Sequence, residues 1–328
     1  MARLSDQDNA AQDNAAYVRE VHDKGLAFDL GTISRRRMLA FLGGAGVVAL
    51  AGGSLLGGAS TAQAAACLEE VESETAGPFP ADGSNGPDVR VQDGVVRSDI
   101  RSSFGDSTGV AEGVPLEFSL VVQDLECSPL AGAAVYAWHC DRAGLYSLYS
   151  TGATEENYLR GIQVADETGK VTFTSIFPAC YAGRWPHVHF EVYTSLEDAT
   201  SGAGPIRKTS QIAFPEEVAD EVYATAEGYE ASVTNMGNIS LATDMVFADD
   251  LAAREMATVT GDVTSGFVAT LTISVDPAGE ETGGGGAGGT PPSGPPPSGV
   301  PSAPAPTAST SAPAPSTSPS DPSTSPSA

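Results

Sequence analysis

The 328-residue chain is predicted to be an all-β protein: a single β-sandwich domain with one or two short helices, an N-terminal signal segment before it and a disordered Pro/Ser/Thr-rich tail after it. Two observations predict the sandwich. The central part consists of short runs rich in Val, Ile, Phe, Tyr and Thr, bounded by Gly, Pro, Asp or Ser. The run at 171–177 alternates apolar and polar residues, as expected for a strand with one face in a core.

Residues 1–66 are predicted to be a twin-arginine-type signal segment. The arginines at 35–37 precede a glycine-rich apolar run at 40–60 and an Ala-x-Ala site at 64–66. A transmembrane anchor is the alternative, but the glycine content of the run makes it a poor anchor. We therefore expect a secreted or cell-surface protein that keeps no stable membrane span once the signal is removed.

Residues 67–282 are predicted to form the sandwich. The segment at 215–226 begins with proline and two acidic residues, which suits the start of one helix. Six strands are expected, at 115–125, 132–140, 169–177, 187–195, 209–214 and 266–275.

Residues 283–328 consist almost entirely of Gly, Pro, Ser, Thr and Ala and are predicted to be disordered, because they cannot bury enough apolar surface to offset chain entropy. A wall-associated or O-glycosylated stalk and a plain solvated tail both fit this composition. The net charge of −26 argues against nucleic acids and anionic membranes as partners.

Four cysteines follow the signal segment, and in an exported chain an even number favours two disulfides. We expect Cys127 to pair with Cys140, because both flank one predicted strand, which leaves Cys67 with Cys180. Lipidation of Cys67 is the competing reading of the "AAAC" sequence.

The stretch "RWPHVHFEVY" at 184–193 holds two of the four histidines of the chain. Residues i and i+2 share one face of a strand, so His187 and His189 can converge on one ion. Two histidines alone do not identify a metal. Glu191 lies on the same predicted face, so a His/His/Glu site for another metal stays open.

Two tyrosines upstream of the pair are the other candidate ligands. Tyr146 follows a turn at Ala143-Gly144, and Tyr181 follows the end of a predicted strand. A phenolate is a hard anionic ligand, and a cation can lower the pKa of a phenol until it ionises. Two imidazoles and two phenolates favour Fe(III) over Fe(II).

Three segments together resemble the intradiol ring-cleavage dioxygenases, and most closely a secreted branch similar to the protocatechuate 3,4-dioxygenase β subunit. They are "VYAWHCDRAGLYS", "LRGIQVADETGKVTFTSIFPACYAGRWPHVHF" and "KTSQIAFPEEV", and they occur in that family's order. The segment "ETAGPF" at 74–79 resembles the family's N-terminal segment that lines the active site.

The resemblance implies one non-haem Fe(III) per chain. Its ligands would be Tyr146, Tyr181, His187 and His189. The phenolate of Tyr181, once displaced, would also act as a base. Arg184 would stabilise negative charge on the substrate, and Gln211 would lie near the oxygen-binding side.

The function that follows is cleavage of a catechol-type ring by O2 between its two hydroxyl-bearing carbons, to give a muconate-type product. The partners would be a small aromatic diol and O2, and the oligomeric state is left open. A non-enzymatic cell-surface β-sandwich binding module is the alternative of another class, but it has no need of the four candidate ligands.

Overall fold

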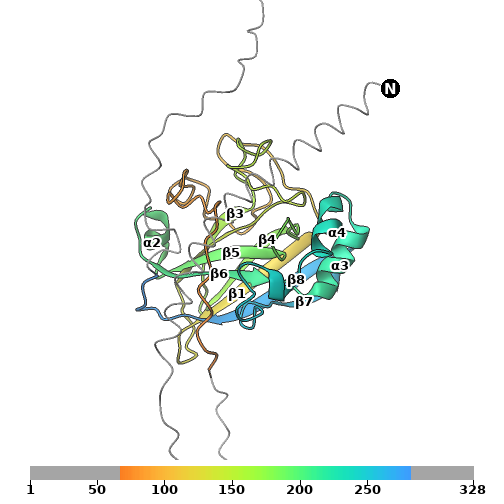
Figure 1. Cartoon of the computed structure of the whole chain (residues 1–328). Helices are drawn as coiled ribbons and strands as arrows, with labels where there is room; N and C mark the ends of the chain where they lie inside the picture. The colour runs from red at the N-terminus through yellow and green to blue at the C-terminus, as the bar shows by residue number, and fades with distance from the viewer. Residues whose placement is uncertain (1–66, 282–328) are drawn as a thin grey trace, which may run out of the picture. The chain divides into compact units, whose positions relative to one another are not determined.

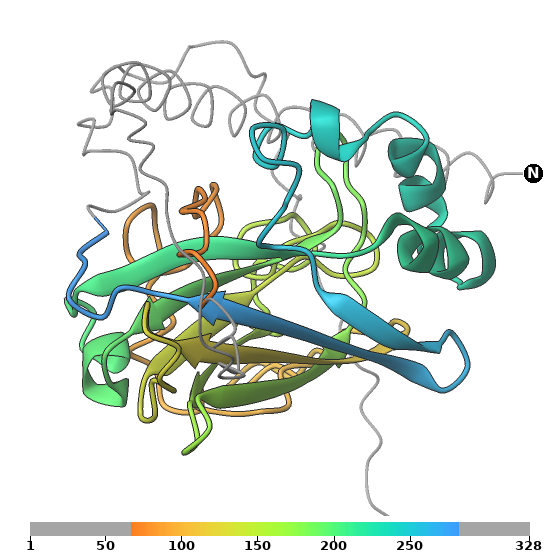
Figure 2. The same cartoon turned by 90° about the horizontal axis from the view of Figure 1, so that it is seen from below.

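The alternating runs of the sequence form one sheet of the computed structural model, which describes residues 67–281. Its strand order is β4-β1-β8-β7, in which β1 runs antiparallel to β4 and parallel to β8. The long β8 lies along β1 in Figure 2. Its alternate side chains are buried, which is the pattern the sequence shows. The strands are β1 (Pro115–Gln123), β4 (Lys170–Ile176), β7 (Thr258–Asp262) and β8 (Gly266–Ser274).

The other sheet has the order β3-β2-β5-β6, and all its neighbouring strands are antiparallel. Every residue of β2 and β5 is buried. In an antiparallel sheet with one face in solvent, buried and exposed side chains alternate along each strand. These two central strands must therefore be covered on both faces. The strands are β2 (Ala134–Trp138), β3 (Arg160–Val164), β5 (His187–Tyr193) and β6 (Ile206–Ala213).

Two separate apolar clusters cover the two faces of this second sheet. The inner cluster lies between the sheets and includes Phe118 and Phe173 of the first sheet with Phe190 of β5. The outer cluster includes Tyr136 and Trp138 of β2 and side chains from the long loops before β1 and after β2. These loops lie above the second sheet in Figure 1. The side chains on the outer face of β5 are therefore buried beneath these loops.

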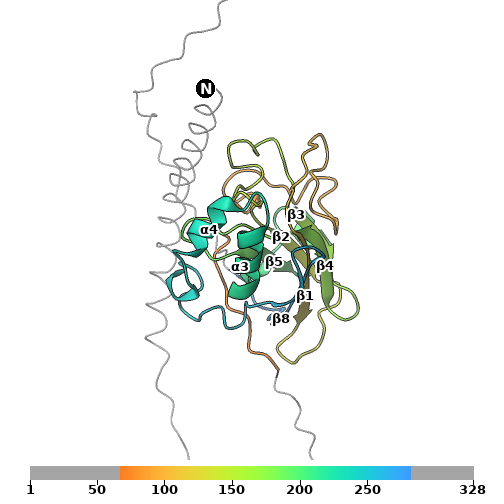
Figure 3. The ribbon, with the colours of Figure 1, turned by 90° about the vertical axis from the view of Figure 1, so that its right-hand side faces the viewer.

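Short helices lie at the two ends of the sandwich. The helix α2 (Leu196–Thr200) packs on β2 and β5, while α3 (Glu216–Thr225) packs on α4 (Glu230–Met236). Figure 1 shows α2 at one end and the α3–α4 pair at the other, and Figure 3 looks onto that pair. A single 3-10 turn, η1 (Leu241–Thr243), follows α4. Within residues 67–281, no helix is both long and apolar enough to cross a bilayer.

The predicted fold class is confirmed, and the helix expected at 215–226 is α3. The strands β3 and β7 are not among the six predicted ones, and both are edge strands of five residues. The strand β7 is largely exposed, so it lacks the apolar positions that mark a strand. The predicted signal segment and tail lie outside the described residues.

The predicted cysteine pairing is wrong. Cys67 bonds to Cys127 with their Cα atoms 5.4 Å apart, whereas Cys140 and Cys180 are buried free thiols. Cys127 and Cys140 lie on either side of β2, whose five residues alone extend about 17 Å. A disulfide allows only about 7 Å between Cα atoms. Flanking one strand therefore separates two cysteines, and the Sγ of Cys67 is not available for lipidation while this bond exists.

Candidate metal centre

The strand β5 places two histidines on the outer, loop-covered face of the second sheet. His187 and His189 are 1% and 2% exposed, and their Nε2 atoms are 3.0 Å apart. Trp138 of the neighbouring β2 lies opposite His189 and stacks on its ring at a centroid distance of 5.0 Å. Strand geometry and this stacking thus direct both imidazole rings toward a common point.

The loop after β2 brings Tyr146 to the same spot. The carboxylate of Asp141 accepts hydrogen bonds from the backbone N–H groups of Ala143 and Leu145, and Gly144 between them has a φ of +84°. The side chain of Arg160 on β3 then holds Ser147 through two hydrogen bonds of 2.9 and 3.0 Å. The buried phenol of Tyr146 is fixed by these contacts of its chain neighbours.

A tight turn after β4 presents Tyr181 and leads into β5. The backbone N–H of Arg184 donates to the carbonyl of Tyr181 at 3.1 Å, and Gly183 inside the turn has a φ of +81°. Tyr181 is partly exposed, whereas Tyr146 is buried. Of the four candidate ligands in the described chain, Tyr181 alone has a side accessible to solvent.

Two phenol oxygens and two imidazole nitrogens therefore converge. The Tyr146 and Tyr181 oxygens are 3.4 Å apart, and they lie 3.4 and 3.3 Å from Nε2 of His187. His187 Nδ1 lies 2.5 Å from the carbonyl of Trp185, and because a carbonyl only accepts, Nδ1 carries the proton. Nε2 of His187 then carries a single lone pair, and both phenols and His189 face it.

Only one of these three neighbours can donate to the lone pair at a time, and the same four atoms can all act as ligands to a cation. A cation at the common centre would use all four donor atoms once the phenols have lost their protons. Phenolate oxygen and imidazole nitrogen together suit a hard or borderline transition-metal ion such as iron. The residues present therefore fit the iron that the sequence analysis expects.

The electrostatics of the metal-free cluster keep Tyr146 and both histidines neutral. Burial lowers the pKa of His187 and of His189 well below the usual histidine value, and the charge of Arg184 lowers both further. Burial, followed by the neighbouring Tyr181, raises the pKa of the Tyr146 phenol well above 10. A bound cation would reverse the effect on the phenol, because it favours the phenolate.

The N-terminal segment at 74–79 forms another wall of the cluster. Gly77 has a φ of +68°, and a Cβ there would lie 3.3 Å from Cε1 of His189. The ring of Phe79 lies 4.9 Å from that of Tyr146, centroid to centroid. A left-handed residue without a side chain is required at Gly77 for the segment to come this close.

Arg184 and Gln211 form one hydrogen-bonded pair beside the histidines. The guanidinium of Arg184 is 3% exposed, and its Nη2 donates to Oε1 of Gln211 at 2.5 Å. Gln211 lies opposite His189 on β6 and donates from Nε2 to the carbonyl of Thr75 at 2.9 Å. The structure thus brings together all six residues that the sequence analysis places in the site.

Glu191, which the sequence left open as a metal ligand, and a third described histidine, His139, have other roles. The carboxylate of Glu191 accepts a hydrogen bond from Tyr193 and faces Arg90. His139 is buried between Ser175 and the carbonyl of Cys140. Among residues 67–281, no three His, Cys, Asp or Glu side chains group to hold a metal. The contacts of Glu191 with Tyr193 and Arg90 argue against the His/His/Glu site that the sequence left open.

Sequence reasoning missed Asp244 and Arg160. Asp244 lies 60 residues beyond Arg184 and accepts a hydrogen bond from its Nε at 3.1 Å. Arg160 fixes the Tyr146 loop and also donates to the carbonyl of Pro80. No local pattern marks Asp244, which is one of 42 acidic residues in the chain. Arg160 lies in a quoted motif, and an arginine within an apolar strand was the signal available there.

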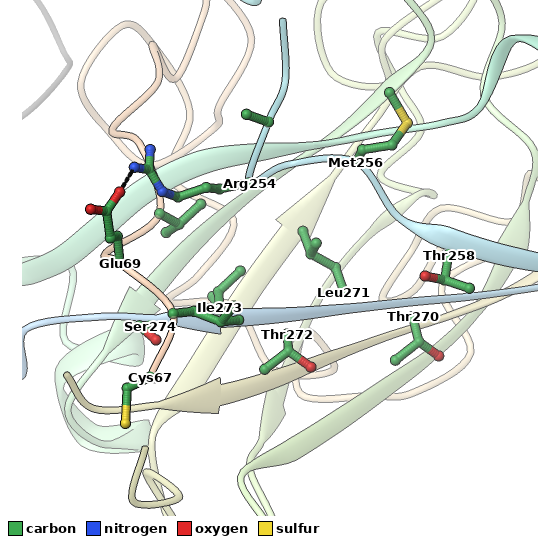
Figure 4. Close-up of a pocket in the computed structure, with 13 residues that line it drawn as sticks. Cys67, Glu69, Arg254, Met256, Thr258, Thr270, Leu271, Thr272, Ile273 and Ser274 are labelled. Carbon is green, nitrogen blue, oxygen red and sulfur yellow. Dashed lines mark hydrogen bonds and ion pairs between the residues drawn. The ribbon is translucent and has the colours of Figure 1, made fainter. Parts of the chain in front are cut away.

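A cavity of about 710 Å³ lies elsewhere, at the edge of β8 where β7 has ended. Figure 4 shows its lining, in which Arg254 pairs with Glu69 next to apolar and threonine side chains. Its lining comes from residues 67–71, 253–258 and 270–274 and includes none of the six site residues. The cavity is therefore separate from the cluster.

Comparison with known proteins places the cluster within a recognised sequence pattern. A family model described as "Dioxygenase" matches residues 86–189, a segment that contains all four candidate ligands. The chain is 35% identical over 69 residues to a chlorocatechol 1,2-dioxygenase from Rhodococcus opacus and 37% identical over 60 residues to a catechol 1,2-dioxygenase from Candida albicans. These matches cover 21% and 18% of the chain, and they span only 27% and 20% of the length of the two relatives.

A solved structure extends the likeness to the whole described fold. The intradiol ring-cleavage dioxygenase from Tetranychus urticae superposes with a TM-score of 0.51 at 22% sequence identity. The alignment covers 66% of this chain and 98% of that one. At this identity the likeness concerns the fold.

Proposed function

We propose that this chain, which belongs to the intradiol ring-cleavage dioxygenase family, opens a catechol-type aromatic ring between its two hydroxyl-bearing carbons with O2. One Fe(III) would be held by Tyr146, Tyr181, His187 and His189. The observation that carries the proposal is that the other three donor atoms each lie 3.0–3.4 Å from Nε2 of His187. The product would be a muconate-type diacid.

The ferric ion, when bound, would polarise a diol and supply redox chemistry that amino-acid side chains lack. The protein's part begins with holding that ion. His187 contributes Nε2 because the carbonyl of Trp185 fixes the proton on Nδ1. Trp138 keeps the ring of His189 in one plane by stacking on it. Both ligands are thus oriented before any metal arrives, which lowers the cost of binding.

Tyr181 is the residue best placed to accept a proton from the substrate. It is the partly exposed member of the four, so an incoming diol can approach it, whereas Tyr146 and both histidines are buried. A phenolate is a competent base towards a catechol hydroxyl, because the two groups have similar pKa values near 10. Tyr181 would therefore serve both as a ligand and as the first base.

Arg184 would stabilise negative charge that develops on the substrate. Its buried guanidinium already lowers the pKa of both histidines, so its positive potential reaches the centre of the cluster. A fixed cation in a buried site stabilises a developing anion without any reorganisation of solvent. Gln211 holds the Nη2 side of this guanidinium and completes the wall next to Thr75.

Export is part of the proposal and is supported by the sequence of residues 1–66. A twin-arginine route carries folded proteins, which suits a chain that binds its metal before it leaves the cell. A catechol outside the cell would then be the substrate. A wall-associated tail at 283–328 would keep the enzyme at the cell surface.

The test is purification of the chain, reconstitution with iron and measurement of O2 uptake with a panel of catechols. We expect about one iron per chain, a red-brown colour from tyrosinate-to-Fe(III) charge transfer, and ring-opened diacid products. Tyr181→Phe should shift the visible band and abolish O2 uptake. A colourless protein that takes up zinc, or no metal, after iron reconstitution would refute the proposal.

A further inference from the structure

We propose that Asp244 is the positioning residue of Arg184 and of the turn that carries Tyr181 and His187. The consequence of this inference for catalysis rests on the proposed function. Its structural part is independent of that function. Asp244 follows η1, a segment far from the motifs that carry the family likeness, and the matched family segment ends at His189. Nothing in those motifs identifies it.

The carboxylate of Asp244 is fully buried and accepts four hydrogen bonds. One oxygen accepts from Nε of Arg184 at 3.1 Å and from the backbone N–H of Trp185 at 2.6 Å. The other oxygen accepts from the backbone N–H groups of Val246 and Phe247 at 2.8 and 2.9 Å. Each oxygen thus has two donors. A carboxylate alone meets this demand, because an asparagine NH2 group would face two other N–H groups.

The contact fixes the guanidinium from one side. Asp244 holds Nε, and Gln211 accepts from Nη2 on the other side at 2.5 Å. The ring of Phe247, next to the Asp244 turn, lies 5.8 Å from the guanidinium carbon. A planar group held at two of its nitrogens has lost its rotational freedom, so the charge that faces the substrate occupies one place.

The same carboxylate also fixes the ligands on each side of Arg184. It bonds to the N–H of Trp185, and the carbonyl of Trp185 accepts from Nδ1 of His187. The N–H of Arg184 donates to the carbonyl of Tyr181. Asp244 is therefore bonded to the middle of the short segment whose ends are two of the four candidate ligands.

The charge of Asp244 is needed as well as its shape. A buried guanidinium without an anionic partner carries a large desolvation penalty, and removing one member of such a pair leaves the other charge uncompensated. Gln211, which accepts from Nη2, is neutral, whereas the ion pair with Asp244 compensates the charge of Arg184 inside the site.

The structural part is tested on the metal-free protein by NMR, through hydrogen exchange of the Arg184 Nε–H. We expect a slowly exchanging Nε–H in the wild type and exchange at least 10-fold faster in Asp244→Asn. The surface pair of Arg101 and Asp99 supplies the matched control, and Asp99→Asn should leave the Arg184 signal unchanged. An Arg184 Nε–H that exchanges equally fast in wild type and Asp244→Asn would overturn the inference.

The catalytic part is tested by a double-mutant cycle on the iron-loaded protein. Asp244→Asn should lower kcat about 100-fold with a smaller effect on KM, since a misplaced catalytic charge costs on this order. In an Arg184→Met background the same substitution should lower kcat much less, because only the contact of Asp244 with the N–H of Trp185 remains to be lost. An equal loss in both backgrounds would show that Asp244 does not act through Arg184.

A second variant covers the case in which Asp244→Asn does not fold. Asp244→Glu keeps the charge and both acceptor oxygens, so we expect it to retain slow Arg184 Nε–H exchange and at least a tenth of the wild-type kcat. A folded Asp244→Glu protein with fast exchange would contradict the inference. Failure of the proposed function would show differently: the wild type would be inactive towards every catechol while the exchange result stood.

Discussion

The outer face of β5 carries two buried polar clusters, one at His187 and His189 and the other at Glu191 and Tyr193. They follow one another along one face of the strand, beneath the loops that cover it. In the second cluster the hydroxyl of Tyr193 donates to Glu191, and Arg90 donates to Tyr193 while pairing with Asp88. In the first cluster both phenols and His189 face the single lone pair of His187.

The difference between the clusters lies in the source of the positive charge. The second cluster has its own cation, Arg90, which donates hydrogen bonds to Asp88 and to Tyr193. Arg184 lies beside the first cluster, but its charge is paired with Asp244. Buried oxygen and nitrogen atoms with no cation among them are the arrangement expected of a metal site before its ion binds.

The largest effect expected from this difference concerns metal retention. His189→Ala removes one of four donors, and we expect iron affinity to fall by more than 100-fold, since even the partners of ligands contribute about 10–100-fold. Glu191→Gln, two residues along the same face, should keep about one iron per chain. Iron content after dialysis against a chelator distinguishes the two. Equal iron loss in both variants would mean that the clusters are one site.

A smaller effect is expected from Gly77→Ala. The new methyl group would lie 3.3 Å from Cε1 of His189, so the ring or the segment must shift, and we expect iron affinity to fall about 10-fold. Gly105→Ala is the matched control, because Gly105 also has a φ of +68° but has no atom within 4 Å of the added Cβ. Both variants carry the left-handed strain of about 1–2 kcal/mol. Similar iron retention in the two variants would show that Gly77 does not touch the site.

Glu191→Gln should have the smallest effect on iron binding. It should, however, change how the stability of the folded protein depends on pH. Burial, and then Asp82, raises the pKa of Glu191 to about 8 from 4.5, although Tyr193 and Arg90 act in the opposite direction. The folded chain keeps this proton up to about pH 8, whereas the unfolded chain releases it near 4.5. The contribution of protonated Glu191 to folding stability is therefore complete below pH 4.5 and is lost as the pH rises to about 8.

Chemical denaturation of both proteins between pH 5 and 8 measures this loss. The glutamine side chain imitates the protonated acid at every pH, so the stability of the wild type should fall relative to Glu191→Gln by up to about 1.4 kcal/mol per pH unit. Parallel curves would show that Glu191 is ionised in the folded protein. Its cluster would then depend on Arg90 for charge compensation as well as for hydrogen bonding.

The sequence predicted the elements that alternate and the residues that lie in motifs. Strands such as β8 were found because their buried positions repeat every two residues, whereas the exposed edge strand β7 has no such pattern. The two histidines could be placed on one face by strand geometry, but choosing Tyr146 and Tyr181 needed the family resemblance. Spacing alone does not say which distant loops meet over a sheet.

Contacts over long sequence distances account for what the sequence did not predict. Asp244 and Arg184 are brought together by the fold of η1 over the turn before β5, and no local pattern encodes that approach. The predicted disulfide is wrong because two cysteines that flank one strand lie towards its opposite ends. Cys67 reaches Cys127 because the N-terminal segment pairs with the end of β8 at Glu70 and Ser274.

The central claim is that four donor atoms from three parts of the chain hold one iron. Anomalous diffraction at the iron absorption edge, from crystals of the iron-loaded protein, tests it most directly. The expected result is one strong anomalous peak bounded by the Tyr146 and Tyr181 oxygens and by Nε2 of His187 and His189. A peak near Glu191, or a peak that contacts the histidines but neither tyrosine, would contradict the account.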